Sequence, residues 1–234
     1  MKKIFLRIEQ PLTKEVALTY ALAVVRAGKI MKTEFLNLQN IDCMELMAQY
    51  PDKHFDLAIV DPPYRDSNQP TKDMRANGSM ETLEGRPTAE YWDELKRVSK
   101  EQIIWGANNF ELPQWKGFVV WRKVPIPENF TMSMCEVAAI SEGLGTVAKV
   151  VEVTPMNQDR VHPTQKPVKL YDWLIGKYAE KGQKILDTHM GSGSIAIACH
   201  YAGCHLTASE LDEDYFSAAC ERIERETRQQ TLFV

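Results

Sequence analysis

The stretch that most constrains this chain is Asp61-Pro62-Pro63-Tyr64, which directly follows an apolar run over residues 55–60. A nearly continuous apolar run of this length is typical of a parallel strand buried on both faces. Two consecutive prolines fix φ and remove two backbone donors, so we expect the strand to end there in a stiff turn. The sequence therefore predicts a buried strand that presents a carboxylate and an aromatic ring at its carboxyl end.

The residues that bracket this turn suit a planar exocyclic amine. The Asp61 carboxylate and the Pro62 carbonyl would accept the two N–H bonds of the amine, and Tyr64 would stack on the attached ring. Adenine and cytosine both carry such an amine. The alternative is a strand that ends in an ordinary Pro-Pro turn, and a second site later in the chain weighs against it.

Length and composition favour one large α/β domain, although two small domains are also compatible with them. The chain has 234 residues, of which 44% are hydrophobic and 26% are charged. No apolar run reaches the length of a membrane span. The apolar stretch over residues 16–25 is short and lies too deep in the chain, behind Lys14 and Glu15, to form a signal peptide. We therefore expect a cytoplasmic protein without a membrane segment.

Cysteine usage and net charge argue against two classes of protein. The five cysteines are scattered and include no Cys-x-x-Cys pair, so neither a disulfide framework nor a metal site is expected. The net charge of −4 is not that of a general nucleic-acid coat protein. Any contact with DNA would therefore depend on a local basic surface and would be sensitive to salt.

A glycine-rich turn forms the second site, between an expected strand over residues 184–187 and an apolar helix over 195–202. A strand, a glycine turn and a helix in this order let the backbone approach a nucleoside ligand closely. Glu210 ends the next strand about twenty residues later, where a carboxylate suits ribose hydroxyls. No third glycine follows in register, so we expect a nucleoside ligand without phosphates, with S-adenosylmethionine (AdoMet) as the obvious candidate. The turn consists of Asp187, Thr188, His189, Met190, Gly191, Ser192 and Gly193.

With both sites in hand, the chain resembles the DNA amino-methyltransferases of the β group. In that group the Asp-Pro-Pro-Tyr motif precedes the AdoMet turn, as residues 61–64 precede residues 187–193 here. The segment His-Pro-Thr-Gln-Lys-Pro at residues 162–167 is a further specific match, and the resemblance covers roughly residues 34 to 225. One departure is His189, where the family usually has Phe beneath the methionine part.

The resemblance implies a fold and a set of site residues. The fold would be α/β, a Rossmann-like AdoMet-dependent methyltransferase with circularly permuted motif order and a mostly parallel seven-stranded sheet with helices on both faces. Asp42 and Cys43 would lie beside the adenine of AdoMet, and Glu210 would bind its ribose. The implied catalytic residues are Asp61, Pro62, Pro63 and Tyr64. The implied AdoMet-binding residues are Asp42, Cys43, Asp61, Thr164, Gln165, Lys166, Asp187, Thr188, His189, Met190, Gly191, Ser192, Gly193 and Glu210.

Two of these positions also have structural interpretations. Asp42 precedes a short expected helix and could serve as its N-cap. His162 could contact the ligand directly or could be a loop histidine with a structural hydrogen bond.

The expected domain organisation has three parts, which are residues 1–30, residues 31–228 and a C-terminal tail over residues 229–234. Residues 1–30 are expected as an accessory extension with a helix that ends at Gly28. Residues 31–228 would form a single catalytic domain, with target-recognition loops within residues 65–160. The long polar stretch near residues 65–88 is expected to be a mobile loop that acts as a lid, contacts DNA or is merely solvated. Its candidate phosphate partners are Arg65, Lys72, Arg75 and Arg86.

The expected function is transfer of the AdoMet methyl group to the exocyclic amine of a base flipped out of double-stranded DNA. Asp rather than Ser at the first motif position favours adenine N6 over cytosine N4. An RNA or protein amine methyltransferase is an alternative, although those enzymes usually place the AdoMet turn first. A non-catalytic DNA- or nucleotide-binding module is the alternative from a different class. The oligomeric state, monomer or homodimer, stays open.

The C-terminal tail carries a weak motif. Gln229-Gln230-Thr231-Leu232-Phe233 resembles the short peptide by which bacterial DNA enzymes dock on the sliding clamp. A C-terminal strand or a frayed tail over residues 229–234 is the alternative interpretation.

Overall fold

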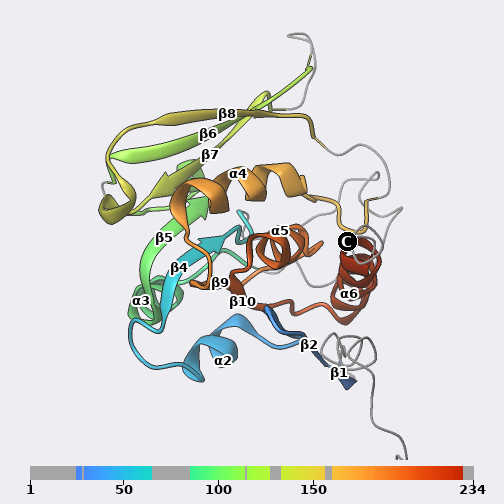
Figure 1. The fold of residues 1–234 in the computed structure, drawn as a ribbon. Helices are drawn as coiled ribbons and strands as arrows, with labels where there is room; N and C mark the ends of the chain where they lie inside the picture. The colour runs from blue at the N-terminus through green and yellow to red at the C-terminus, as the bar shows by residue number, and fades with distance from the viewer. Residues whose placement is uncertain are drawn as a thin grey trace, which may run out of the picture.

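In the described part of the chain, ten strands form one sheet (Figure 1). The computed structural model describes residues 25–27, 29–64, 85–113, 115–126, 133–155 and 160–228. Across the sheet the strands follow the order β1-β2-β3-β10-β9-β4-β5-β7-β6-β8. Their bounds are β1 (Val25–Ala27), β2 (Ile30–Lys32), β3 (Leu36–Gln39), β4 (Phe55–Val60), β5 (Ser99–Trp105), β6 (Gly117–Lys123), β7 (Cys135–Ile140), β8 (Lys149–Val153), β9 (Lys184–Asp187) and β10 (His205–Ser209).

The sheet has a parallel centre and mixed flanks. Neighbouring strands from β3 through β10, β9 and β4 to β5 are parallel. On one flank, β1 and β2 pair antiparallel with each other, and β2 pairs antiparallel with β3. On the other flank, β7 runs antiparallel to both β5 and β6, while β6 and β8 are parallel to each other. The predicted Rossmann-like α/β architecture is confirmed, but the described residues form ten strands rather than seven. β1 and β2 extend one edge, and β8 extends the other.

The first two strands correct the prediction for the N-terminal extension. Val25–Ala27 forms β1, which pairs with β2, so the helix expected to continue to Gly28 is wrong over these residues. β2 in turn pairs with β3 and buries Met31. Pairing with the sheet edge therefore outweighs local helix propensity in this stretch. Residues 1–24 lie outside the described part of the chain.

Helices cover both faces of the sheet (Figure 1). Alternate residues of one strand point to opposite faces, so Ile103 and Trp105 of β5 belong to the larger core cluster and Ile104 to the smaller one. The larger cluster packs α4, α5 and α6 on one face, and the smaller packs α2 and α3 on the other. The helices are α2 (Cys43–Ala48), α3 (Ala89–Val98), α4 (Val168–Tyr178), α5 (Ser194–Ala202) and α6 (Glu213–Arg228), with 3₁₀ turns η2 (Ala107–Asn109) and η3 (Glu142–Leu144).

The carboxyl ends of the parallel strands meet at one edge of the sheet. Asp61 follows β4, Thr188 follows β9 and Glu210 follows β10. β4 pairs directly with β9 in the register Leu57 to Ile185. Two segments more than a hundred residues apart in sequence therefore become neighbours at the edge where parallel α/β sheets bind their ligands.

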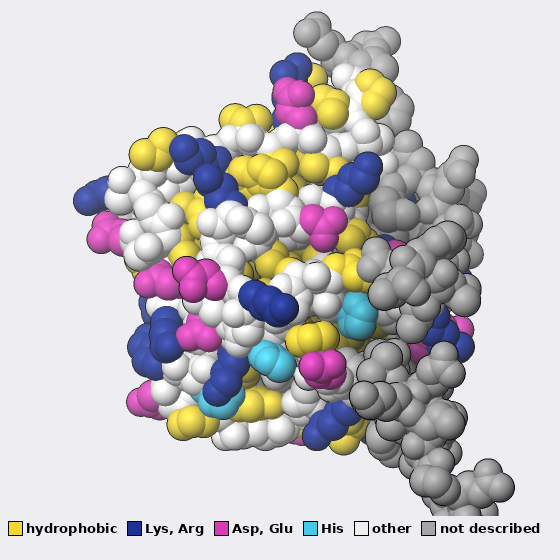
Figure 2. Space-filling view, in the orientation of Figure 1, with side chains coloured by type: hydrophobic (Ala, Val, Ile, Leu, Met, Phe, Trp, Pro, Cys, Tyr) yellow, Lys and Arg dark blue, Asp and Glu magenta, His cyan; other side chains and the backbone are white. Residues whose placement is uncertain are grey.

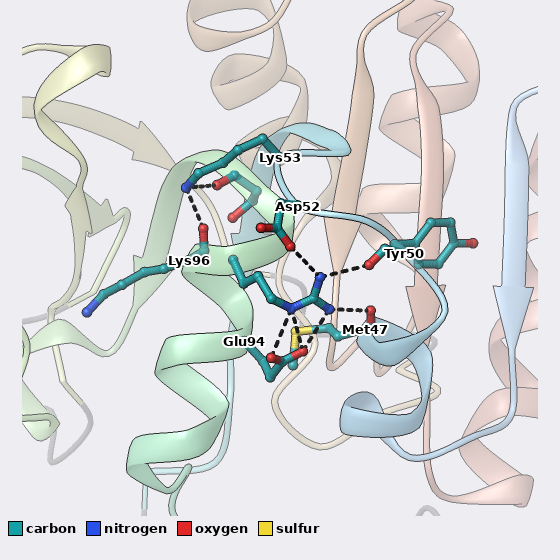
Figure 3. A network of polar contacts seen from close by, with 8 residues as sticks. Met47, Tyr50, Asp52, Lys53, Glu94 and Lys96 are labelled. Atoms are coloured by element: carbon teal, nitrogen blue, oxygen red, sulfur yellow. Dashed lines mark hydrogen bonds and ion pairs between the residues drawn. The ribbon is translucent and has the colours of Figure 1, made fainter.

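A polar network at the opposite edge fixes the amino ends of β4 and β5 (Figure 3). The Arg97 guanidinium donates to the carbonyls of Met47 and Tyr50 and pairs with Glu94. Lys53 donates to the carbonyl of Ser99 at 3.0 Å. These bonds join α3 to the loop between α2 and β4, so we interpret this cluster as structural.

The surface carries no single sign of charge on the face drawn in Figure 2, where acidic and basic side chains alternate. Val147, just before the outer strand β8, is 62% exposed, and Val150, within that strand, is 63% exposed. Among the described helices, none combines the length and the apolar character needed to cross a lipid bilayer.

Candidate functional site

The Asp-Pro-Pro-Tyr turn holds its acid and its aromatic residue against each other. The Tyr64 hydroxyl donates to Asp61 Oδ1 at 2.5 Å. The Tyr64 ring lies on Gly106, which has a φ of +69° and follows β5, and it packs edge-on against Phe110 at 5.8 Å between ring centroids. A Cβ at Gly106 would lie 2.1 Å from Tyr64 Cε1, so glycine is required for this ring position. The ring therefore rests on the protein, and stacking of Tyr64 on a base stays a prediction.

The second carboxylate oxygen of Asp61 is paired with a lysine. Lys166 Nζ forms an ion pair with Asp61 Oδ2 and a second one with Glu136 Oε2 at 3.1 Å. Glu136 comes from β7 and also pairs with Lys123 at 2.7 Å. The Lys166 side chain is only 5% exposed and lies over the Trp105 ring, at 5.4 Å from its centroid.

Mutual attraction outweighs burial in this cluster. Burial disfavours the Lys166 ammonium, but the Asp61 and Glu136 carboxylates raise its pKa above the usual value. Burial likewise disfavours the Glu136 carboxylate, yet Lys166 and Lys123 lower its pKa. The pKa of Tyr64 is raised, first by burial and then by the charge of Asp61. Lys166 and Glu136 therefore both stay charged near neutral pH, and Tyr64 stays protonated.

Sequence reasoning assigned Lys166 to the AdoMet site and missed Glu136 and Lys123. In the structure the Lys166 ammonium forms an ion pair with Asp61, and its predicted contact with AdoMet stays a prediction. The one available signal for Glu136 was an acidic residue beside the apolar segment Val137-Ala138-Ala139-Ile140.

The glycine turn after β9 is attached to the end of β10. Glu210 Oε2 accepts the Gly191 N–H at 2.8 Å, and Oε1 accepts the Asp212 N–H at 3.0 Å. Met190 donates its N–H to the Ser209 carbonyl at 2.9 Å. Burial raises the pKa of Glu210, although the backbone N–H groups oppose that shift. Glu210, which is predicted to bind the ribose, therefore also fixes the shape of the turn.

The buried Arg222, which sequence reasoning did not single out, also binds the backbone of this turn. Arg222 of α6 is 1% exposed and donates to the Ser192 carbonyl at 3.0 Å and to Ser194 Oγ at 2.9 Å. Ser194 Oγ in turn donates to the Lys166 carbonyl at 2.6 Å. The His-Pro-Thr-Gln-Lys-Pro segment and the glycine turn therefore form one connected unit.

Asp187 lies in a setting that disfavours its charge. It is 2% exposed, and burial raises its pKa to about 8, although the His189 N–H that it accepts at 3.0 Å acts against this. The charges of Asp61 and Glu210 raise it further. The pKa of His189 is lowered to about 4 by burial, so its ring is neutral and pairs through Nδ1 with the Thr188 hydroxyl at 2.9 Å.

For His162 and Asp42 the structural interpretations are what the structure shows. His162 is 6% exposed, its Nδ1 accepts the Thr164 N–H at 3.3 Å, and burial lowers its pKa to about 4. Asp42 Oδ1 caps α2 by accepting the Met44 N–H at 2.7 Å. Cys43 begins that helix, and burial raises its thiol pKa to about 11. These bonds do not test whether the same residues also contact AdoMet.

Among the candidate phosphate partners, the structure describes Arg86. It donates to the Tyr64 carbonyl at 3.0 Å and to the Asn109 carbonyl at 2.6 Å, so it braces the amine site. Arg65, Lys72 and Arg75 lie outside the described residues, as does the predicted clamp-binding peptide at residues 229–233.

Part of this chain is similar to known DNA methylases. Residues 120–221 match the family described as DNA methylase, whose designation refers to N6 and N4 methylation. The inferred methylase YubD of Escherichia coli (strain K12) is 26% identical over 205 residues, which are 78% of this chain and 87% of that protein.

Two solved structures share the fold. The DNA methyltransferase PvuII, described as cytosine-N4-specific, has a TM-score of 0.58 at 12% identity and covers 83% of this chain and 90% of its own. The complex of M1.HpyAVI with S-adenosylmethionine has a TM-score of 0.51 at 21% identity and covers 80% of this chain and 99% of its own. The family match over residues 120–221, the methylase relative and the shared fold together support a DNA amino-methyltransferase.

Proposed function

We propose that this enzyme transfers the methyl group of S-adenosylmethionine to the exocyclic N6 of an adenine flipped out of double-stranded DNA. The observation that carries the proposal is the pairing of β4 with β9, which brings Asp61 beside the glycine turn. The charge of Asp61 is close enough to raise the pKa of Asp187, which begins that turn. An amine bound at Asp61 would therefore lie next to a ligand bound at the turn.

The residues at the glycine turn fit AdoMet. Asp187 is a buried carboxylate with a raised pKa, so a cationic ammonium of the methionine part would compensate its charge. Glu210 stands at the end of β10, and its remaining lone pairs can accept ribose hydroxyls. Asp42 and Cys43, with Thr164 to Lys166, would complete the surroundings of the adenine and of the methionine part. When bound, AdoMet supplies a methyl group activated by the adjacent sulfonium.

The protein's part in the reaction is to orient the amine. The nitrogen lone pair of adenine N6 is delocalised into the ring, which makes it a poor nucleophile. Asp61 and the Pro62 carbonyl would accept its two N–H bonds, favour a pyramidal nitrogen and aim it at the methyl carbon. Transfer would leave S-adenosylhomocysteine and release one N–H proton of the amine, for which the Asp61 carboxylate would be the acceptor, and no covalent enzyme intermediate is needed.

Adenine is favoured over cytosine because the first motif residue is Asp61 rather than Ser. Cytosine N4 is the second candidate, since a structural neighbour with the same fold is described as cytosine-N4-specific. An RNA or protein amine methyltransferase and a non-catalytic DNA- or nucleotide-binding module are less well supported, because the motif order and the paired Asp61 fit a DNA enzyme. The predicted clamp contact, cytoplasmic location and monomeric or dimeric state have no bearing on this choice.

The test is transfer of radiolabelled methyl from AdoMet to unmethylated genomic DNA, followed by digestion to nucleosides. We expect the label in N6-methyladenine for the wild type. Asp61→Ala should lose transfer while AdoMet binding, measured by calorimetric titration, stays within about threefold. Label in N4-methylcytosine would select the second candidate, and retained transfer by Asp61→Ala would refute the role of Asp61.

A further inference from the structure

Four charged side chains of alternating sign run from the amine site into the sheet: Asp61, Lys166, Glu136 and Lys123. Lys166 is shared between the two acids, and Glu136 is shared between the two lysines. The side chains of Lys166 and Lys123 are 5% and 10% exposed, and those of Asp61 and Glu136 are 17% and 24% exposed. These charged groups are therefore largely shielded from water and paired with one another.

The Lys166 ammonium occupies the place that the base amine needs. Both are nitrogen donors, and Asp61 Oδ2 already accepts from Lys166 while Oδ1 accepts from the Tyr64 hydroxyl. A base amine would therefore compete with the ammonium for Asp61 Oδ2. Among the described residues, the neighbouring acceptor for that ammonium is Glu136, whose Oε2 lies 3.1 Å from Nζ.

Glu136 is positioned to keep the Lys166 ammonium paired if that ammonium moves away from Asp61. Lys123 binds its Oε1 at 2.7 Å and lies over the Trp121 ring, while Lys166 lies over the adjacent Trp105 ring. Withdrawal of a buried ammonium from its only acid would leave an uncompensated charge, which is strongly unfavourable. With Glu136 in place, the ammonium keeps one ion pair throughout.

We propose that Glu136 and Lys166 are positioning residues for the target amine: Lys166 holds Asp61 in its acceptor orientation until the base arrives, and Glu136 then takes the ammonium so that the amine can bind Asp61. This proposal rests on the proposed function. It assigns to β7 a role in base capture that is separate from AdoMet binding.

The decisive experiment is a double-mutant cycle. Glu136→Gln keeps the shape of the side chain but leaves Lys166 with Asp61 as its only acid, so kcat/KM for methyl transfer to DNA should fall by about tenfold or more. Lys166→Met added to Glu136→Gln frees Asp61, so the double variant should regain at least about fivefold over Glu136→Gln alone. A double variant at or below the activity of Glu136→Gln would overturn the proposal.

AdoMet binding separates positioning from a merely structural role. The dissociation constant for AdoMet, measured by calorimetric titration, should stay within about threefold of wild type in Glu136→Gln, and transfer by the variants that change Lys166 is compared at saturating AdoMet. Loss of AdoMet binding or of a cooperative melting transition in Glu136→Gln would show that the pair only supports the fold. Glu152→Gln is the matched control, because Glu152 pairs with Arg122 in an exposed ion pair of the same sheet region and should keep full transfer.

A charge-conserving variant gives an independent test. Lys166→Arg keeps the positive charge, but its planar fork can bind a carboxylate through two parallel bonds and should hold Asp61 more firmly. We expect transfer at saturating AdoMet to fall by about a hundredfold. Near-normal transfer by Lys166→Arg would contradict the exchange. If the wild type itself transfers no methyl to DNA, the proposed function fails; if it does and the double variant shows no recovery, only this inference fails.

Discussion

Gly106→Ala offers a sharp test of how the amine site is built, because the three atoms nearest to a Cβ at Gly106 all belong to the Tyr64 ring. The backbone there has a φ of +69°, which disfavours alanine by about 1–2 kcal/mol. The new Cβ would lie 2.1 Å from Tyr64 Cε1, 2.5 Å from Cζ and 2.7 Å from Cδ1. Relief of this overlap adds about 1–3 kcal/mol, so we expect the free energy of unfolding to fall by about 2–5 kcal/mol.

The effect on activity should be larger than the effect on stability. To reach ordinary contact distance the Tyr64 ring must withdraw by more than about 1 Å, and misplacement of that size can lower a rate about a hundredfold. The withdrawal would also break the hydrogen bond from the Tyr64 hydroxyl to Asp61. The assay is labelled methyl transfer to DNA at saturating AdoMet, with unfolding by urea and AdoMet titration as parallel measurements.

Gly182→Ala is the matched control. Gly182 has a φ of +87°, and a Cβ there would meet nothing within 4 Å. It should lose about 1–2 kcal/mol of stability and keep full activity. Transfer by Gly106→Ala within threefold of Gly182→Ala would refute the claim that Gly106 positions Tyr64.

The remaining predictions concern the glycine turn. AdoMet binding at about pH 7 should release up to about one proton, because Asp187, with its pKa raised to about 8 by burial, would ionise beside the methionine ammonium. Calorimetry in buffers of different ionisation enthalpy should show this proton release in the wild type and not in Asp187→Asn. Equal proton release in both proteins, or none in the wild type, would contradict it. For the same reason the contribution of Asp187 to stability should fall as the pH rises from about 4 to about 8, since its charged form is disfavoured in the folded state. His189→Phe should keep AdoMet affinity within about threefold, because the ring is already neutral and loses only its bond to Thr188; a loss beyond tenfold would argue for a direct role. Arg222→Met should weaken AdoMet binding by about tenfold or more in the same titration, because two bonds that hold the turn are lost, and unchanged affinity would show that the turn does not depend on them.

The sequence predicted the parts of the site that depend on local signals. The apolar run before Asp61 and the paired prolines mark the end of β4, and the glycines mark the turn after β9. Both features follow from backbone restrictions of proline and glycine, which act wherever the residues stand. The Asp42 cap was likewise predictable from its position before α2, and the structure shows it.

The sequence could not predict contacts that depend on how distant segments pack. Glu136 and Lys123 lie on the antiparallel flank, where a charged residue usually marks a solvated face, yet here they pair behind the amine site. Arg222 belongs to a highly charged segment, and that pattern predicts a solvent-exposed helix. In the structure, however, Arg222 of α6 is buried against the glycine turn. The position of the Tyr64 ring on Gly106 required the register of β4 against β5.

The central claim is that the amine-binding acid and the AdoMet turn face one another. A crystal structure of the enzyme with AdoMet tests this most directly. The account predicts that the ribose lies at Glu210, that the methionine part lies over the glycine turn and that the sulfonium methyl points toward Asp61, within about 5 Å of its carboxylate. AdoMet bound elsewhere, or bound at the turn with its methyl directed away from Asp61, would contradict the account.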